Sequence, residues 1–114
     1  MSRDERDRLQ DIRAAIAAIR LHLADTIAEP HGKESQLLHD ALLFQFVVIG
    51  EAVKNLARET QESEPDIPWA DVAGLRDLIA HEYFRIDIER VLEIVDRVLP
   101  PLEQAIGRLL DGQT

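Results

Sequence analysis

The sequence predicts an all-α fold, an up-and-down bundle of four main helices in a single domain over residues 1–114. Glycine and proline contribute only five residues each, while alanine, leucine, isoleucine, glutamate and arginine are abundant, a composition that favours helices over sheets. Apolar residues recur at intervals of three and four along most of the chain. No internal repeat, low-complexity segment or linker divides the sequence, which favours one domain with one core.

The first two helices are expected over residues 3–28 and 34–59, separated by the helix-breaking sequence at 30–32. The first carries one apolar stripe, made by Leu9, Ile12, Ile16, Ile19, Leu23 and Ile27. The second is apolar on more than one side, because Leu37, Phe44 and Val47 lie off its main apolar face. Either a further helix of the same chain or a partner subunit covers that second face. Of these we favour a twofold homodimer, the commonest oligomer.

The second half of the chain predicts a loop, a short helix and a long final helix. Residues 61–67 read as a polar loop, and Pro68 suits the first turn of the short helix, with Asp66 or Ile67 near its cap. The final helix is expected to begin near Asp87 as N-cap. Pro100–Pro101 must kink or break it, because each proline lacks an amide donor and collides with the preceding turn.

Composition excludes several classes of function. The chain has no cysteine, so disulfides and thiolate chemistry are excluded, and no histidine spacing implies a metal or other cofactor. We expect His22, His31 and His39 to be solvated. The net charge of −9 and the absence of a basic stripe argue against extended DNA binding, but a compact site for one or two phosphates remains open. No apolar run approaches the length of a membrane span, and we expect a cytoplasmic protein without a membrane partner.

Residues 76–83 concentrate the groups that can do chemistry. Arg76 offers a planar fork of donors that suits a phosphate, His81 can exchange a proton near neutral pH, and Tyr83 adds a hydroxyl. In one continuous helix Arg76 and His81 would lie about 140° apart around the axis. We expect the helix to end near Ala80, so that the chain turns and brings His81 back over Arg76. The alternative is a solvated arginine and packing aromatics with no function.

Two segments resemble the HepT-like toxins of the HEPN ribonuclease superfamily. Residues 67–84 (IPWADVAGLRDLIAHEYF) contain the R-x4-H-x-Y signature of that family, and residues 49–56 (IGEAVKNL) are similar to its second helix. The resemblance implies a helical dimer that places two such motifs around a shared cleft. It implies metal-independent cleavage of RNA, not DNA, within a type VII toxin–antitoxin module, with a MntA-type nucleotidyltransferase antitoxin as partner.

By position, the resemblance assigns Arg76 and His81 to the catalytic pair and Tyr83 to the residue that the antitoxin modifies with AMP. Asp77 occupies the polar slot that follows the arginine. Glu51 is a further candidate, since a carboxylate within an apolar run either pairs with Arg76 and orients it or faces water.

Three functions remain open on the sequence. The first is a ribonuclease in which Arg76 holds the scissile phosphate and His81 serves as base toward the ribose 2′-hydroxyl or as acid toward the leaving oxygen. The second is a non-catalytic dimeric scaffold or nucleotide-sensing partner of a nucleotidyltransferase. The third is a bundle in which the arginine and histidine are purely structural.

Overall fold

The protein is all-α, as predicted. The structure, a computed structural model, describes residues 3–27 and 36–112, and within these ranges it contains six helices and no strand. The helices are α1 (Arg3–Ile27), α2 (Gln36–Lys54), α3 (Arg58–Glu62), α4 (Trp69–Ala73), α5 (Leu75–Glu82) and α6 (Ile88–Asp111).

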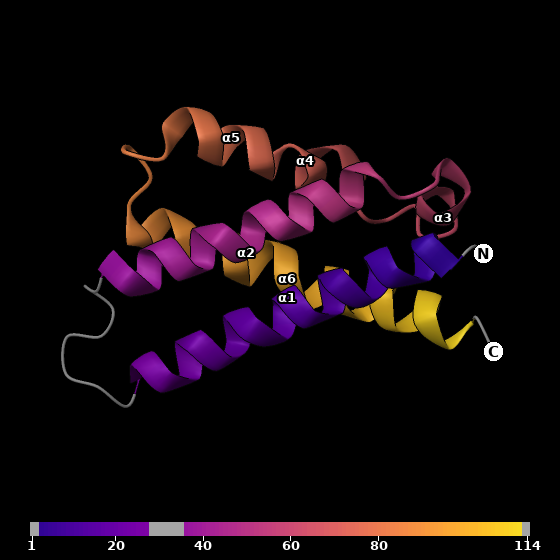
Figure 1. Ribbon diagram of the computed structural model, residues 1–114, viewed down its shortest axis with the longest axis horizontal. Helices are drawn as coiled ribbons and strands as arrows, with labels where there is room; N and C mark the ends of the chain where they lie inside the picture. The colour runs from indigo at the N-terminus through magenta and orange to yellow at the C-terminus, as the bar shows by residue number, and fades with distance from the viewer. Residues whose placement is uncertain (1–2, 28–35, 113–114) are drawn as a thin grey trace.

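The helices form an up-and-down bundle with α2 at its centre (Figure 1). Following the chain, α1 runs in one direction, α2 returns, α4 and α5 together run back, and α6 returns again. Helix α2 packs against α1, α4, α5 and α6. Its length and composition would also allow a membrane span, but half of that stretch is buried inside the bundle, as in the core helix of a globular domain.

The core confirms most of the predicted stripe of the first helix, because Leu9, Ile12, Ile16 and Ile19 are buried and Leu23 is partly buried, while the side chain of Ile27 lies outside the described part of the structure. The largest fully buried side chains of the core come from α1, α2 and α6, with Val72 from α4: Leu9, Ile12, Ile16, Ile19, Leu42, Phe46, Ile49, Val53, Val72, Leu99, Leu102 and Ile106. Burial of each such side chain contributes about 1.5–3 kcal/mol to folding, which makes this core the main source of stability.

Helix α2 ends five residues earlier than the sequence predicts. The amide of Asn55 donates to the Glu51 carbonyl oxygen at 2.8 Å, which provides a side-chain partner at the end of the helix. Beyond it, the backbone amide of Ala57 donates to the buried carboxylate of Glu5 on α1, also at 2.8 Å. These contacts end α2 at Lys54 and start the separate helix α3 at Arg58.

The loop expected at 61–67 begins two residues later, because Gln61 and Glu62 belong to α3. The indole of Trp69 donates to the carbonyl oxygens of Gln61 and Glu64, at 2.9 and 3.0 Å, and fastens the loop to the start of α4. Pro68 itself stands at the N-cap of α4, without a side-chain cap, so neither Asp66 nor Ile67 has the predicted capping role.

Helix α6 begins as predicted and continues through both prolines. The Asp87 carboxylate accepts the amide of Arg90 at 2.9 Å. Pro100 and Pro101 lie inside the helix, so of the two expected outcomes, a kink or a break, the break does not occur. Both prolines are exposed, so water can reach the carbonyl oxygens that lose their amide partners.

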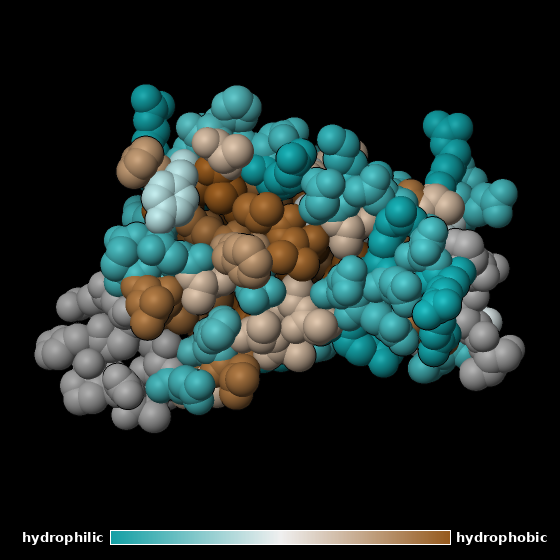
Figure 2. All heavy atoms as spheres, in the orientation of Figure 1, coloured by the Kyte–Doolittle hydropathy of each residue, from teal (hydrophilic) through white to brown (hydrophobic). Residues whose placement is uncertain are grey.

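The second apolar face of α2 is not covered by any described helix. Leu37 is 78% exposed and Phe44 is 63% exposed, and Val47 and Val48 are only partly buried. Figure 2 shows apolar side chains gathered over the face of the molecule that α2 crosses. The described part of the chain therefore supplies no helix for this face, and the partner subunit remains a prediction.

Candidate functional site

Arg76 and His81 both lie on α5 and are exposed. The expectation that this helix ends near Ala80 is wrong, because α5 continues through His81 to Glu82. No glycine or proline interrupts this part of the sequence, and the amides of Arg85 and Ile86 donate to the Glu82 carbonyl oxygen at 2.7 and 3.0 Å. The turn that we expected before His81 therefore comes after His81, at residues 83–85.

This continuity separates the two side chains within one subunit. Five helical positions correspond to about 140° around the axis and about 7.5 Å along it. The backbone does not fold His81 back over Arg76, so the pair does not converge through a local turn.

Arg76 is oriented by Glu51. Its Nε lies 3.1 Å from the Glu51 carboxylate, and the two side chains are 44% and 52% exposed. Glu51 therefore pairs with Arg76, the first of the two alternatives, and its carboxylate also remains accessible to water. Asn55 donates more weakly to the same carboxylate, at 3.4 Å. Because the ion pair uses Nε, the terminal nitrogens of the guanidinium are left for a ligand such as a phosphate.

Gly50 brings the backbone of Arg76 close to α2. A Cβ atom at this position would lie 3.0 Å from the Arg76 backbone nitrogen and 3.2 Å from the Ala73 carbonyl oxygen. Any larger residue would push α2 away from the junction between α4 and α5. Glycine at this position therefore sets the separation at which Glu51 reaches Arg76.

A shallow groove of about 520 Å³ lies beside Arg76. It is lined by Arg8 and Asp11 of α1, by Val47, Val48, Glu51 and Ala52 of α2, and by Asn55 and Arg76. Arg8 places a second cation in this groove. Arg8 was not predicted as a site residue, because it is far from Arg76 in the sequence and only the packing of α1 against α2 brings it into the groove.

Tyr83 directly follows α5 and forms a hydrogen bond to a residue of α2. Its hydroxyl donates to the Asp40 carboxylate at 2.5 Å, and the Gln36 amide donates to the same oxygen at 2.8 Å. The hydrogen bond from Tyr83, followed by that from Gln36, lowers the pKa of Asp40 below its ordinary value. The same bond to Asp40 raises the pKa of Tyr83, because it favours the protonated phenol.

His39 differs from the sequence expectation, because it is buried rather than solvated. Its Nε2 lies 2.6 Å from the Ile86 carbonyl oxygen, a contact that requires a proton on that nitrogen. Its Nδ1 lies 3.4 Å from Asp40, and its ring meets the Tyr83 ring edge-on. Of the other histidines, His22 is partly buried and His31 lies outside the described residues. Among the described residues, no three potential ligands gather as a metal site would require.

Asp77 is exposed in the first turn of α5, where an acidic side chain complements the positive end of a helix. It follows Arg76 directly, so it points about 100° away around the axis. The ion-pair partner of Arg76 is Glu51 rather than Asp77.

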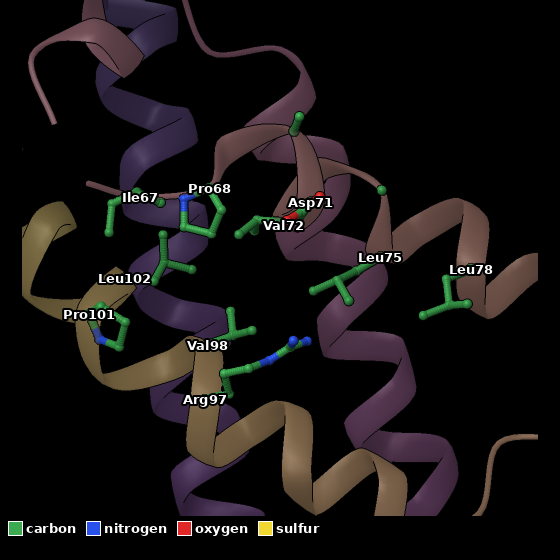
Figure 3. A pocket seen from close by; sticks show the side chains of 12 residues that line it. Ile67, Pro68, Asp71, Val72, Leu75, Leu78, Arg97, Val98, Pro101 and Leu102 are labelled. Atoms are coloured by element: carbon green, nitrogen blue, oxygen red, sulfur yellow. The ribbon is translucent and has the colours of Figure 1, made fainter. Parts of the chain in front are cut away.

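Another hollow, of about 410 Å³, lies between the α4–α5 segment and α6 (Figure 3). Its walls are mainly aliphatic and proline side chains, and Arg97 extends from α6 along its edge. Asp71 and Arg97 are its ionisable groups. None of the site residues predicted from sequence lines it. The groove beside Arg76 and the surface of α5 are therefore the candidate site.

Comparison with known proteins identifies relatives over most of the chain. The family model described as ribonuclease HepT-like matches residues 12–109. A probable ribonuclease HepT from Thermococcus cleftensis is 31% identical over 111 residues, which cover 96% of this chain and 98% of that protein. A putative RNase from Caldanaerobacter subterraneus subsp. tengcongensis is 36% identical over 77 residues, which cover 68% of this chain and 69% of that protein. No solved structure matches the chain significantly.

Proposed function

The chain belongs to the HepT-like ribonuclease family, and we propose that it is a metal-independent RNA endonuclease that acts in the cytoplasm as the toxin of a toxin–antitoxin module. The observation that carries this proposal is the exposed α5, on which Arg76 and His81 face solvent and Glu51 orients the arginine. The second candidate, a non-catalytic scaffold, needs neither Arg76 nor His81, so the effect of replacing these residues on RNA cleavage distinguishes the two functions.

The proposal requires a dimer. Since Arg76 and His81 diverge on one helix, a complete site combines Arg76 of one subunit with His81 of the other. A twofold axis that brings two α5 helices together creates two such combinations. The uncovered apolar face of α2, with Leu37 and Phe44, supports this arrangement, because α2 packs directly against α5 and a partner that covers this face lies next to the site.

In this site the two residues divide the chemistry of strand cleavage. Arg76 binds the scissile phosphate and stabilises the charge that develops on its oxygens. His81 of the other subunit takes the proton from the ribose 2′-hydroxyl, whose oxygen attacks the phosphorus, and the leaving 5′-oxygen takes a proton from solvent. The products are a 2′,3′-cyclic phosphate and a free 5′-hydroxyl. The 2′-hydroxyl is the nucleophile, so DNA cannot react.

This mechanism is tested with matched oligonucleotides. We expect the purified protein to cut a single-stranded RNA in the presence of EDTA and to leave the DNA of the same sequence intact. An RNA with a single 2′-deoxy nucleotide at the cleavage position should resist cutting at that bond alone, and mass spectrometry should find cyclic-phosphate ends. Cleavage of the DNA, or loss of RNA cleavage in EDTA, would contradict the proposal.

We further propose that a nucleotidyltransferase antitoxin inactivates the protein by transferring AMP to Tyr83. Tyr83 is two positions from His81, so an attached nucleotide lies close enough to occupy the cleft. Its phosphate would compete with RNA for Arg76 and repel the RNA backbone.

Coexpression with a nucleotidyltransferase of this kind tests the modification. Intact mass should increase by whole AMP units, and the modified protein should lose RNA cleavage. Tyr83→Phe should carry no adduct. Because Tyr83 is the only tyrosine of the sequence, loss of the adduct in this variant assigns the modification to it directly. An adduct that persists in Tyr83→Phe would show that another residue is the acceptor.

A further inference from the structure

We propose that Asp40 is the general base for modification of Tyr83: its carboxylate accepts the hydroxyl proton as the tyrosine oxygen attacks a nucleoside triphosphate. This inference rests on the proposed inactivation by AMP transfer and adds a residue of this chain to that reaction. Asp40 lies on α2, 43 positions from Tyr83 in the sequence, and it does not belong to the R-x4-H-x-Y motif.

The first argument is the geometry of the hydrogen bond. The Tyr83 hydroxyl donates to Asp40 Oδ1 at 2.5 Å, a distance typical of a strong bond between a hydroxyl and a charged carboxylate. No shift of the helices is needed for proton transfer, because donor and acceptor are already in contact. The carboxylate is therefore positioned to remove the proton that the tyrosine must lose.

The second argument is that neighbouring groups hold Asp40 in place and charged. The Gln36 amide donates to the same carboxylate oxygen, and His39 lies beside it with its far nitrogen fixed on the Ile86 carbonyl oxygen. Among the described residues, Tyr83 and His39 are the titratable groups that act on Asp40. The hydrogen bonds from Tyr83 and Gln36, with a smaller effect from His39, lower the pKa of Asp40, so its carboxylate is charged at neutral pH. It takes the proton as the tyrosine oxygen bonds to phosphorus, because that bond makes the hydroxyl more acidic.

The third argument is that the acceptor lies at an open surface. The Asp40 side chain is 45% exposed, and Tyr83 is only partly buried. Phe84, which meets the Tyr83 ring edge-on with centroids 5.1 Å apart, is 97% exposed. A nucleotide held by a partner enzyme can therefore approach the hydroxyl without unfolding of the bundle.

The proposed step balances as a nucleotidyl transfer. The Tyr83 oxygen forms a bond to the α-phosphorus of the triphosphate, and the bond from that phosphorus to the bridging oxygen of the pyrophosphate breaks. Pyrophosphate leaves with the electron pair of that bond, and the hydroxyl proton passes to Asp40. Without this acceptor, the attacking species at neutral pH is the small fraction of ionised tyrosine, whose ordinary pKa is about 10.

Asp40→Asn tests the role of Asp40 as the base. The asparagine amide oxygen can still accept the hydrogen bond from the Tyr83 hydroxyl, but it cannot take up the proton. The full-length variant and wild type are incubated with the purified nucleotidyltransferase and ATP, and adduct formation is followed by intact mass from about pH 6.5 to 9.5. We expect the variant to react about 10²-fold more slowly near pH 7. The ratio of variant to wild-type rate should increase with pH, by up to about tenfold per pH unit, as tyrosine ionises without help.

Two controls make the outcome specific. Asp96→Asn makes the same chemical change at an exposed position on α6 and should react like wild type at every pH. Circular dichroism should show equal helix content in all three proteins. A slow Asp40→Asn variant with the pH profile of wild type would reduce Asp40 to a structural role, and an unchanged rate would remove it from the reaction. Absence of an adduct on wild type would overturn the modification of Tyr83 itself, and the role of Asp40 with it.

Discussion

Replacement of His81 by alanine should reduce RNA cleavage by about 10²–10⁴-fold, the range expected when a general acid or base is removed. Arg76→Ala should lower the rate by a similar factor of about 10²–10³, because the developing charge on the phosphate loses its cationic partner. Neither change should affect stability noticeably, since both side chains are exposed at the surface of α5. The measurement is single-turnover cleavage of a labelled RNA.

Arg85→Ala is the matched control for the loss of a positive charge. Arg85 is exposed in the turn that follows α5, and it lies outside the proposed site. We expect its cleavage rate to stay within a few-fold of wild type, because a general loss of charge weakens RNA binding without removing the chemistry. A His81→Ala protein that cuts at the wild-type rate would exclude His81 from the mechanism.

Mixing two inactive variants should restore activity if each site combines residues of two subunits. In a mixed dimer of Arg76→Ala and His81→Ala subunits, one of the two sites receives an intact arginine from one subunit and an intact histidine from the other. With random exchange half of the dimers are mixed, so cleavage should return to about a quarter of the wild-type rate. The large separation of the two residues around α5 is the reason for this expectation.

The mixture of Arg76→Ala with an Arg76→Ala/His81→Ala double variant is the control for this experiment. Neither subunit then supplies the arginine, so activity should stay at the level of the single variants. Size-exclusion chromatography with light scattering provides the oligomeric state of each sample. A mixture of the two single variants that remains inactive, although mixed dimers have formed, would show that each site takes both residues from one subunit.

The sequence predicted the helical architecture, but it did not predict where α2 and α5 end. The spacing of apolar residues in the first helix and the capping side chain of Asp87 are local signals, and both were confirmed. The early end of α2 depends on the Ala57 amide reaching Glu5, a residue 52 positions away. The predicted end of α5 was wrong. The aromatic residues after His81 suggested a turn near Ala80, but the helix continues to Glu82.

By itself, the sequence determined the all-α class, the order of the main helices and the presence of an arginine, a histidine and a tyrosine within eight positions. These properties depend on helical periodicity and on residue type, which are local. Only the tertiary structure decided that Glu51 orients Arg76, that Arg8 enters the same groove and that Asp40 holds the hydroxyl of Tyr83. Each of these contacts joins segments that are distant in the sequence, and the relative placement of these segments is set by packing around α2, which no local pattern encodes.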